Sequence, residues 1–276
     1  MTNPTKTFLF LAGLSTLMLL VGYGLMGRQG LLLGFSLAIS LNFFIYFYSE
    51  NRLSGIFAGR EIEGRDPWKL NTLIQKIAFE AKIPPPRLLL IPIETPTAFS
   101  IGRTWNTARI VVSEGLLNTL DESEVHAVMA HEISHIKKLD TLSFGVASAL
   151  AGALLSGASL LDGVFHWIFR SRNASTGFFT AAMAPLAALV LRLTVQSVSD
   201  YEADEFAAAS VGDPEILASS LWKLRAYAST KPVKVPPSTA HLFVVNPLTM
   251  RGTNRYFHTQ PSVESRIEKL IGRYPI

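Results

Sequence analysis

The chain alternates between long uncharged stretches and polar stretches. Two uncharged runs of similar length, residues 8–26 and 31–48, are joined by the short link at 27–30. A helix of about 20 apolar residues crosses the hydrocarbon core of a bilayer. A cleaved signal peptide needs a small-residue cleavage site and is not followed by a second span, so the pattern predicts a retained membrane hairpin.

Two more apolar runs lie at 141–161 and 176–191. The first is rich in Ser, Gly and Ala, which is typical of a helix that packs closely against other helices. The second contains Pro185 and is followed by Arg192. Buried helices of a soluble domain have a similar pattern, but together with the first hairpin these runs favour about four transmembrane helices.

Basic residues near the ends of the predicted spans indicate their orientation. Arg28 alone lies in the link, whereas the cytoplasmic flanks would carry Lys6, Arg52, Arg60, Arg65 and Lys69. This bias predicts that the segment before the first span and the segment after residue 48 face the cytoplasm.

The remaining stretches are polar and predict a folded domain in two parts. Residues 67–82 have apolar positions at i, i+3 and i+4 spacing, which predicts a helix, and β-rich runs at 87–93 and 108–115 predict strands. The predicted fold class is therefore α+β, mainly helical, with a small β-sheet. We expect membrane hairpins and domain parts to alternate along the chain as 1–48, 49–140, 141–195 and 196–276.

Composition narrows the class of protein. Of 276 residues, 49% are hydrophobic and 17% are charged, whereas about 25% charged is usual for soluble domains. The lack of cysteine excludes a disulfide framework and a thiolate zinc site, which leaves His and carboxylate side chains as metal ligands. The net charge of +4 comes without a dense basic run, so nucleic acid is not an expected partner.

A predicted helix carries the strongest chemical signal, an H-E-x-x-H motif. Asp121 and Glu124 have the spacing of a helix N-terminal capping box, and the motif follows as His131, Glu132 and His135. Spacing of i and i+4 projects both imidazoles from one face, where they can bind one metal ion, with Glu132 beside them to accept a proton. The alternative is a pair of surface histidines on an amphipathic helix.

A catalytic zinc needs a third protein ligand and an open position. The helical stretch 197–210 offers four carboxylates: Asp200, Glu202, Asp204 and Glu205. Asp200 and Asp204 share a helix face at i, i+4, whereas Glu202 lies about 200° from Asp200. One face can therefore supply a ligand and a carboxylate that orients a ligand histidine. An acidic turn that complements the helix dipole is the alternative for any one of them.

Several segments in order resemble one family. They are AKIPPPRLLLIP, TPTAFSIGR, ARIVVSEGLLNTL, EVHAVMAHEISHIKKLD, SDYEADEFAAAS, AHLFVVNPL and FHTQPSVESRIEKL. The chain resembles the M48 family of membrane zinc metalloproteases, and most of all its HtpX-like branch. The resemblance implies a gluzincin-type metallopeptidase domain with one Zn²⁺ per chain.

The resemblance also implies roles for individual residues. His131 and His135 match the family's histidine ligands, and Glu132 matches its catalytic glutamate. The family pattern E-[FY]-x-A-D falls on residues 200–204, so Asp200 stands where the family usually has Glu. Asp200 is favoured over Glu202 as third ligand because Asp204 then keeps its family place, which we expect to orient a ligand histidine.

Two further departures concern substrate binding. The family's N-A-F-A-x-G segment, which resembles an edge strand that pairs with extended substrate, begins here with Thr97, Ala98 and Phe99. The family's T-H-P is Thr-Gln-Pro, so Gln260 can donate a hydrogen bond but cannot titrate. Arg266 also matches the family, and we expect it to hold the C-terminal helix through a salt bridge.

These observations predict a multi-pass zinc endopeptidase of the bacterial inner membrane, with its catalytic domain in the cytoplasm. The expected substrates are polypeptides, in particular misfolded membrane proteins and their exposed loops. The alternative is a catalytically inactive zinc-binding membrane scaffold, but a structural zinc site does not need Glu132. A metal transporter places ionisable residues inside its spans, which these four runs lack. The oligomeric state is not predicted.

Overall fold

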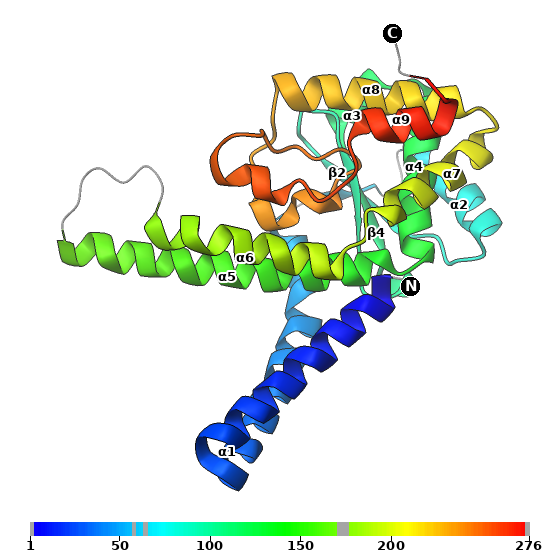
Figure 1. The fold of residues 1–276 in the computed structure, drawn as a ribbon. Coiled ribbons are helices and arrows are strands. Elements are labelled where there is room, and N and C mark those ends of the chain that lie inside the picture. Colours follow the sequence, from blue (N-terminus) through cyan, green and yellow to red (C-terminus); the bar gives the residue numbers. More distant parts are fainter. Residues whose placement is uncertain (1–2, 57–58, 63–65, 170–176, 274–276) are drawn as a thin grey trace.

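The computed structural model describes residues 3–56, 59–62, 66–169 and 177–273 (Figure 1). Helices and 3₁₀ turns surround one small sheet. In chain order the elements are α1 (Asn3–Ile56), β1 (Arg60–Glu61), α2 (Leu70–Ala81), β2 (Arg87–Ile91), β3 (Ala98–Ile101), η1 (Trp105–Thr107), β4 (Arg109–Ser113), α3 (Glu114–Thr119), α4 (Glu122–Lys137), α5 (Asp140–Phe169), α6 (Phe178–Thr194), α7 (Val198–Val211), α8 (Pro214–Thr230), η2 (Pro237–Leu242), η3 (Gly252–Phe257) and α9 (Val263–Ile271).

Helix α1 folds back on itself as a hairpin. Its helical backbone breaks at Met26 and Gly27, and Gly27 has a φ of 59°, which favours glycine. The two halves approach so closely that a Cβ on Gly30 would lie 1.8 Å from the Gly22 carbonyl oxygen. Apolar helices in a bilayer pack through small residues in this way. The helical hairpin is therefore observed, and its place in a membrane stays a prediction.

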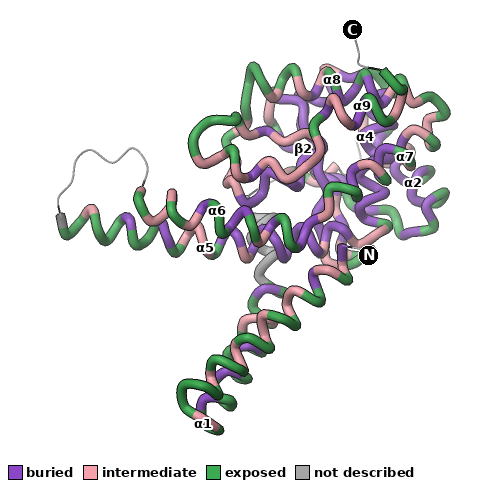
Figure 2. The backbone as a smooth tube through the Cα atoms, in the orientation of Figure 1, coloured by how far each residue is buried: buried purple, intermediate pink, exposed green. Residues whose placement is uncertain are grey.

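The number of membrane spans is confirmed only in part. By length and composition, two helical segments can cross a membrane, Asn3–Phe47 and Asp140–Ile168, or three if α6 and α7 are one span bent by 51°. Helix α6 has 17 residues, about 26 Å at 1.5 Å per residue, which is shorter than the roughly 30 Å thickness of a hydrocarbon core. Half of the apolar window of α5 is buried against protein, whereas that of α1 is exposed (Figure 2).

The sheet is mixed, with strand order β1-β2-β4-β3. Strand β2 runs parallel to β4, and β1 and β3 pair antiparallel to their neighbours. The strands predicted at 87–93 and 108–115 are observed as the shorter β2 and β4, and the helix predicted at 67–82 is α2. Strand β3 is the last strand in this order, next to β4. Helix α4, which contains the H-E-x-x-H motif, packs against β3.

Alternate residues of the strands enter two different cores. Leu88 and Ile110 pack with α2, α4, α8 and α9, whereas Val111 and Phe99 pack with α5 and α6. The sheet therefore lies between the domain helices and the α5–α6 pair. Because one sheet is shared by both cores, the α5–α6 pair is tied to the domain that carries the motif helix.

Candidate metal centre

The H-E-x-x-H motif lies in the middle of α4. Asp121 accepts a hydrogen bond from the Glu124 backbone nitrogen at 2.9 Å, and the Glu124 carboxylate accepts one from the Asp121 nitrogen at 3.1 Å. This capping box begins the helix where the sequence predicts it. His131, Glu132 and His135 are all buried, which excludes the alternative of surface histidines.

The two motif histidines direct their Nε2 atoms toward each other. These atoms are 3.2 Å apart, while His131 Nδ1 lies 2.9 Å from Asp204 and His135 Nδ1 lies 3.0 Å from Asp140. Because an ionised carboxylate only accepts hydrogen bonds, each Nδ1 carries the proton and each Nε2 presents a lone pair. Two lone pairs at this distance repel each other unless a metal cation or a proton lies between them, and the neighbouring carboxylates, Asp140 first, raise the pKa of His135 despite its burial.

Asp200 completes the cluster from α7, and Glu202 does not. One ligand atom each from His131, His135 and Asp200 lies within 4.8 Å of the other two, and His135 Nε2 is 3.9 Å from Asp200 Oδ1. Glu202 is exposed and accepts a hydrogen bond from Lys138 at 2.6 Å. The i, i+4 spacing on α7 therefore turns Asp200 and Asp204 toward α4, and Glu202 away from it.

The spacing of these atoms suits zinc. Tetrahedral ligands at about 2.0–2.1 Å from zinc lie about 3.3 Å from one another. The observed separations of 3.2 and 3.9 Å bracket that value. Two imidazoles, one carboxylate and no thiolate form a donor set typical of catalytic zinc, in which a fourth position stays open.

The electrostatics of the cluster also favour a cation. Burial raises the pKa of Glu132 to about 7 and that of Asp200 to about 6, because both carboxylates lie away from water. Burial lowers the pKa of His131 to about 4, so that this imidazole is neutral at neutral pH. Among the described residues, no donor reaches hydrogen-bond geometry at either Glu132 oxygen, although the Ser100 side chain lies close enough to lower this pKa.

The predicted salt bridge of Arg266 is confirmed, and it reaches the cluster. Arg266 is buried on α9 and donates to both oxygens of Asp204, at 2.8 and 2.6 Å. Burial alone would raise the pKa of Asp204, but the guanidinium and the contact with His131 hold that pKa at about 2. Asp204 is therefore a charged carboxylate in contact with His131 Nδ1, the position that the predicted role of orienting this histidine requires.

The outer edge of β3 pairs with another segment of the same chain. Phe99 forms an antiparallel bridge with Phe243, and the Val244 nitrogen donates to the Ala98 oxygen at 3.1 Å. Gln260 Nε2 donates to the Phe243 oxygen at 2.7 Å, so it holds this segment in place. Thr97 donates from its nitrogen to Ser113 Oγ. Of the four predicted substrate contacts, Ala98, Phe99 and Gln260 therefore contact residues 243–244 in the structure. Thr97 contacts the neighbouring strand β4.

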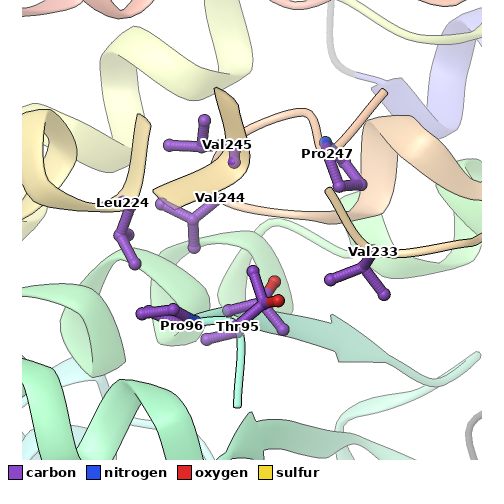
Figure 3. Close-up of a pocket in the computed structure, with 10 residues that line it drawn as sticks. Thr95, Pro96, Leu224, Val233, Val244, Val245 and Pro247 are labelled. Atoms are coloured by element: carbon purple, nitrogen blue, oxygen red, sulfur yellow. The ribbon is translucent and has the colours of Figure 1, made fainter. Parts of the chain in front are cut away.

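A small apolar cavity adjoins this pairing. It lies between the residues before β3 and the segment after Phe243, with Pro96 and Thr95 on one side and Val244, Val245 and Leu224 on the other (Figure 3). Its volume of about 10 Å³ holds about one water molecule. The residues 243–245 are therefore closely packed but do not fill all the space beside β3.

Asp140 belongs to the cluster although no sequence motif singled it out. It begins α5, is buried, and contacts His135 Nδ1 at 3.0 Å. The available signal was an acidic residue five positions after His135, at the edge of an apolar run. His126, on the same helix, is not part of the cluster, and its Nε2 lies 3.1 Å from Ser210 Oγ.

The fold and the cluster define a metallopeptidase of the H-E-x-x-H class, attached to apolar helices. The profile of Peptidase family M48 matches residues 65–274, and the chain belongs to that family. It is 37% identical over 277 residues to a "Protease HtpX homolog" of Desulforapulum autotrophicum, covering 98% of this chain and 90% of the relative. It is 35% identical to a "Protease HtpX homolog" of Pyrococcus furiosus, covering 96% of this chain and 94% of the relative.

A solved structure supports the fold. The chain aligns with the crystal structure of S. mikatae Ste24p with a TM-score of 0.50 and 16% identity, over 96% of this chain. The chain spans 65% of the length of Ste24p. At this identity the likeness concerns the arrangement of helices and sheet.

Proposed function

We propose that the protein is a membrane-integral zinc endopeptidase in which His131, His135 and Asp200 hold one Zn²⁺ and Glu132 is the catalytic base. The observation that carries this proposal is the Glu132 carboxylate, which is buried next to the ligand cluster with the Ser100 side chain nearby but no donor in hydrogen-bond geometry among the described residues. A structural metal site has no use for such a group, because a buried unpaired carboxylate destabilises the fold.

Zinc, when bound, supplies a Lewis acid that polarises water and the scissile carbonyl. Glu132 accepts a proton from the attacking water, whose hydroxyl adds to the carbonyl carbon. Glu132 then returns that proton to the leaving nitrogen as the C–N bond breaks. A pKa of about 7 suits a group that both takes up and releases a proton near neutral pH.

The substrate backbone is proposed to pair with β3, at Thr97, Ala98 and Phe99. An extended peptide adds to a sheet edge through main-chain hydrogen bonds. The bridge between Phe99 and Phe243 gives the antiparallel direction for that pairing. Substrate therefore replaces Phe243 and Val244 on β3, and the amide donor of Gln260 is released to the incoming backbone.

The proposed substrates are misfolded membrane proteins and their exposed loops. A site held at the membrane surface by apolar hairpins meets such polypeptides first. The bias of basic residues around the spans supports a cytoplasmic catalytic domain in a bacterial inner membrane. The same proposal includes four spans, namely the two halves of the α1 hairpin, α5 and α6. It also includes the division of the chain into membrane and domain parts after residues 48, 140 and 195.

Cleavage of casein by the full chain in detergent tests the activity. We expect Glu132→Gln to lower the rate by about 10²–10⁴-fold, because it removes the proton acceptor. Bound zinc is quantified in the same samples and stays at one per chain. Glu202→Gln is the matched control, since Glu202 is exposed and outside the cluster.

The outcomes separate the enzyme from the scaffold. Loss of cleavage with zinc retained in Glu132→Gln supports the peptidase. Stoichiometric zinc without cleavage by the parent chain, in an assay where another M48 peptidase is active, would establish the inactive scaffold instead.

A further inference from the structure

Asn3, the first residue of α1, lies buried against the outer side of the metal cluster. Its side-chain amide donates to Asp140 Oδ1 at 2.8 Å, and its carbonyl oxygen accepts from the Gln196 backbone nitrogen at 2.9 Å. Only 3% of Asn3 is exposed. Both halves of this amide are therefore used for contacts far away in the sequence.

The partner of Asn3 is the carboxylate that orients a proposed zinc ligand. Asp140 Oδ2 accepts from His135 Nδ1 at 3.0 Å and from the Ser199 hydroxyl. With Oδ2 shared by two donors, the Asn3 amide on Oδ1 fixes the rotation of the carboxylate plane. Such outer contacts on a ligand histidine set its tautomer and direction.

Asn3 also joins the two elements that bring Asp140 and Asp200 to α4. Asp140 is the first residue of α5, while Gln196 precedes α7, which carries Asp200 and begins beside Ser199. The contacts between α1 and the rest of the chain therefore include one side chain that bridges the starts of α5 and α7. A residue that only anchored the hairpin would not need to contact Asp140, the carboxylate that accepts a hydrogen bond from His135.

We propose that Asn3 is a positioning residue of the metal centre. Through Asp140 it fixes the direction of His135, and through Gln196 it fixes the start of α7. The first turn of the membrane hairpin is thus part of the metal site. This inference rests on the metal ligands of the proposed function, but not on peptide cleavage.

Zinc affinity of the full chain in detergent, measured by competition with a chromogenic chelator, tests the proposal. We expect Asn3→Leu to weaken zinc binding about 10-fold, the lower end of the 10–100-fold typical of outer contacts to ligands, because Asn3 acts through Asp140. Asn3→Asp has the same shape but places a second carboxylate against Asp140, so a larger loss is expected. Asn3→Gln keeps the donor and should recover part of the affinity.

Asn42→Leu is the matched control. Asn42 Nδ2 donates to Ser15 Oγ at 2.9 Å inside the same hairpin and does not contact Asp140. We expect the metal-free forms of Asn3→Leu and Asn42→Leu to unfold at similar temperatures, while only Asn3→Leu loses zinc affinity. The visible spectrum of the Co²⁺-loaded protein should change only in the Asn3 variants.

Unchanged zinc affinity and an unchanged Co²⁺ spectrum in folded Asn3→Leu would overturn the proposal. Equal losses in Asn3→Leu and Asn42→Leu would overturn it as well, because they would assign the effect to hairpin stability. A parent chain that binds zinc but cleaves no casein would refute the proposed function and leave this inference intact.

Discussion

Replacement of Arg266 by Met removes the buried cation that pairs with Asp204. Arg266 lies on α9 with 1% of its side chain exposed, and its guanidinium donates to both Asp204 oxygens and, at 2.5 Å, to the Val244 oxygen. Met fills most of the same volume. It leaves the Asp204 carboxylate buried with His131 as its remaining described partner.

Two estimates give the size of the effect. Breaking a buried ion pair by removing one partner costs about 3–5 kcal/mol, because the other charge stays buried. The lowering of the Asp204 pKa from 3.8 to about 2 corresponds to about 2.5 kcal/mol, at about 1.36 kcal/mol per pKa unit. Because this pKa is lowered in the folded state, the stabilisation is present above pH 4 and is lost as the pH falls toward 2. The first value is larger because the net pKa shift already contains the opposing effect of burial, which raises the Asp204 pKa.

Thermal unfolding of the metal-free chain in detergent, at one scan rate, measures the effect. In a protein of this size, 1 kcal/mol shifts the unfolding temperature by about 2–4 °C, so Arg266→Met should unfold about 6–20 °C below the parent. Arg273→Met is the control, because Arg273 pairs with Glu215 at the surface with 67% of its side chain exposed. Such a pair contributes about 0–1 kcal/mol. Equal unfolding temperatures for the two variants would refute the reasoning.

Three further predictions concern the metal and the substrate. Asp200→Ala should weaken zinc binding by more than about 100-fold, whereas Glu202→Gln should not change it; metal analysis of the dialysed proteins distinguishes the two ligands. In Ala98→Cys/Val244→Cys, the two cysteines lie next to the antiparallel bridge between Phe99 and Phe243 and are joined by a backbone hydrogen bond; antiparallel geometry places such Cα atoms about 5.5 Å apart, which suits a disulfide. Oxidation should abolish casein cleavage and reduction should restore it, with both single variants unaffected; cleavage by the oxidised protein would show that substrate does not need this edge. Zinc at 100 times its Kd should stabilise the chain by about 2.7 kcal/mol, seen as a rise of about 5–11 °C in unfolding temperature, and Asp200→Ala should lack this rise.

Local spacing made part of the site predictable. The capping box, the i, i+4 histidines and the i, i+4 pair Asp200 and Asp204 depend only on helix geometry, which the sequence determines within one or two turns. The choice between Asp200 and Glu202 needed the resemblance to a family, because one helix has no preferred face until another helix packs against it. The structure supplies that helix as α4, against which α7 packs.

Contacts between distant segments were not predictable. Asn3 and Asp140 are separated by 137 positions, and nothing in the apolar pattern of α1 indicates that its first side chain is buried. The pairing of Phe243 with β3 depends on how the segment after η2 closes over the sheet. The count of spans is ambiguous for a related reason: half of the apolar window of α5 is buried against protein and half is exposed, and composition does not separate these environments.

The charges of the cluster explain why metal binding and folding should be coupled. Among the described residues, the cluster contains one buried guanidinium, that of Arg266, and four buried carboxylates. The carboxylates are those of Glu132, Asp140, Asp200 and Asp204. Removal of so many carboxylates from water is unfavourable unless positive charge accompanies them, and the raised pKa values of Glu132 and Asp200 reflect that cost. A divalent cation held by His131, His135 and Asp200, as proposed above, would offset most of this cost. The same ion then stabilises the junction of α4, α5 and α7, to which Asn3 attaches the membrane hairpin, so loss of metal should loosen the hairpin from the domain as well as abolish hydrolysis.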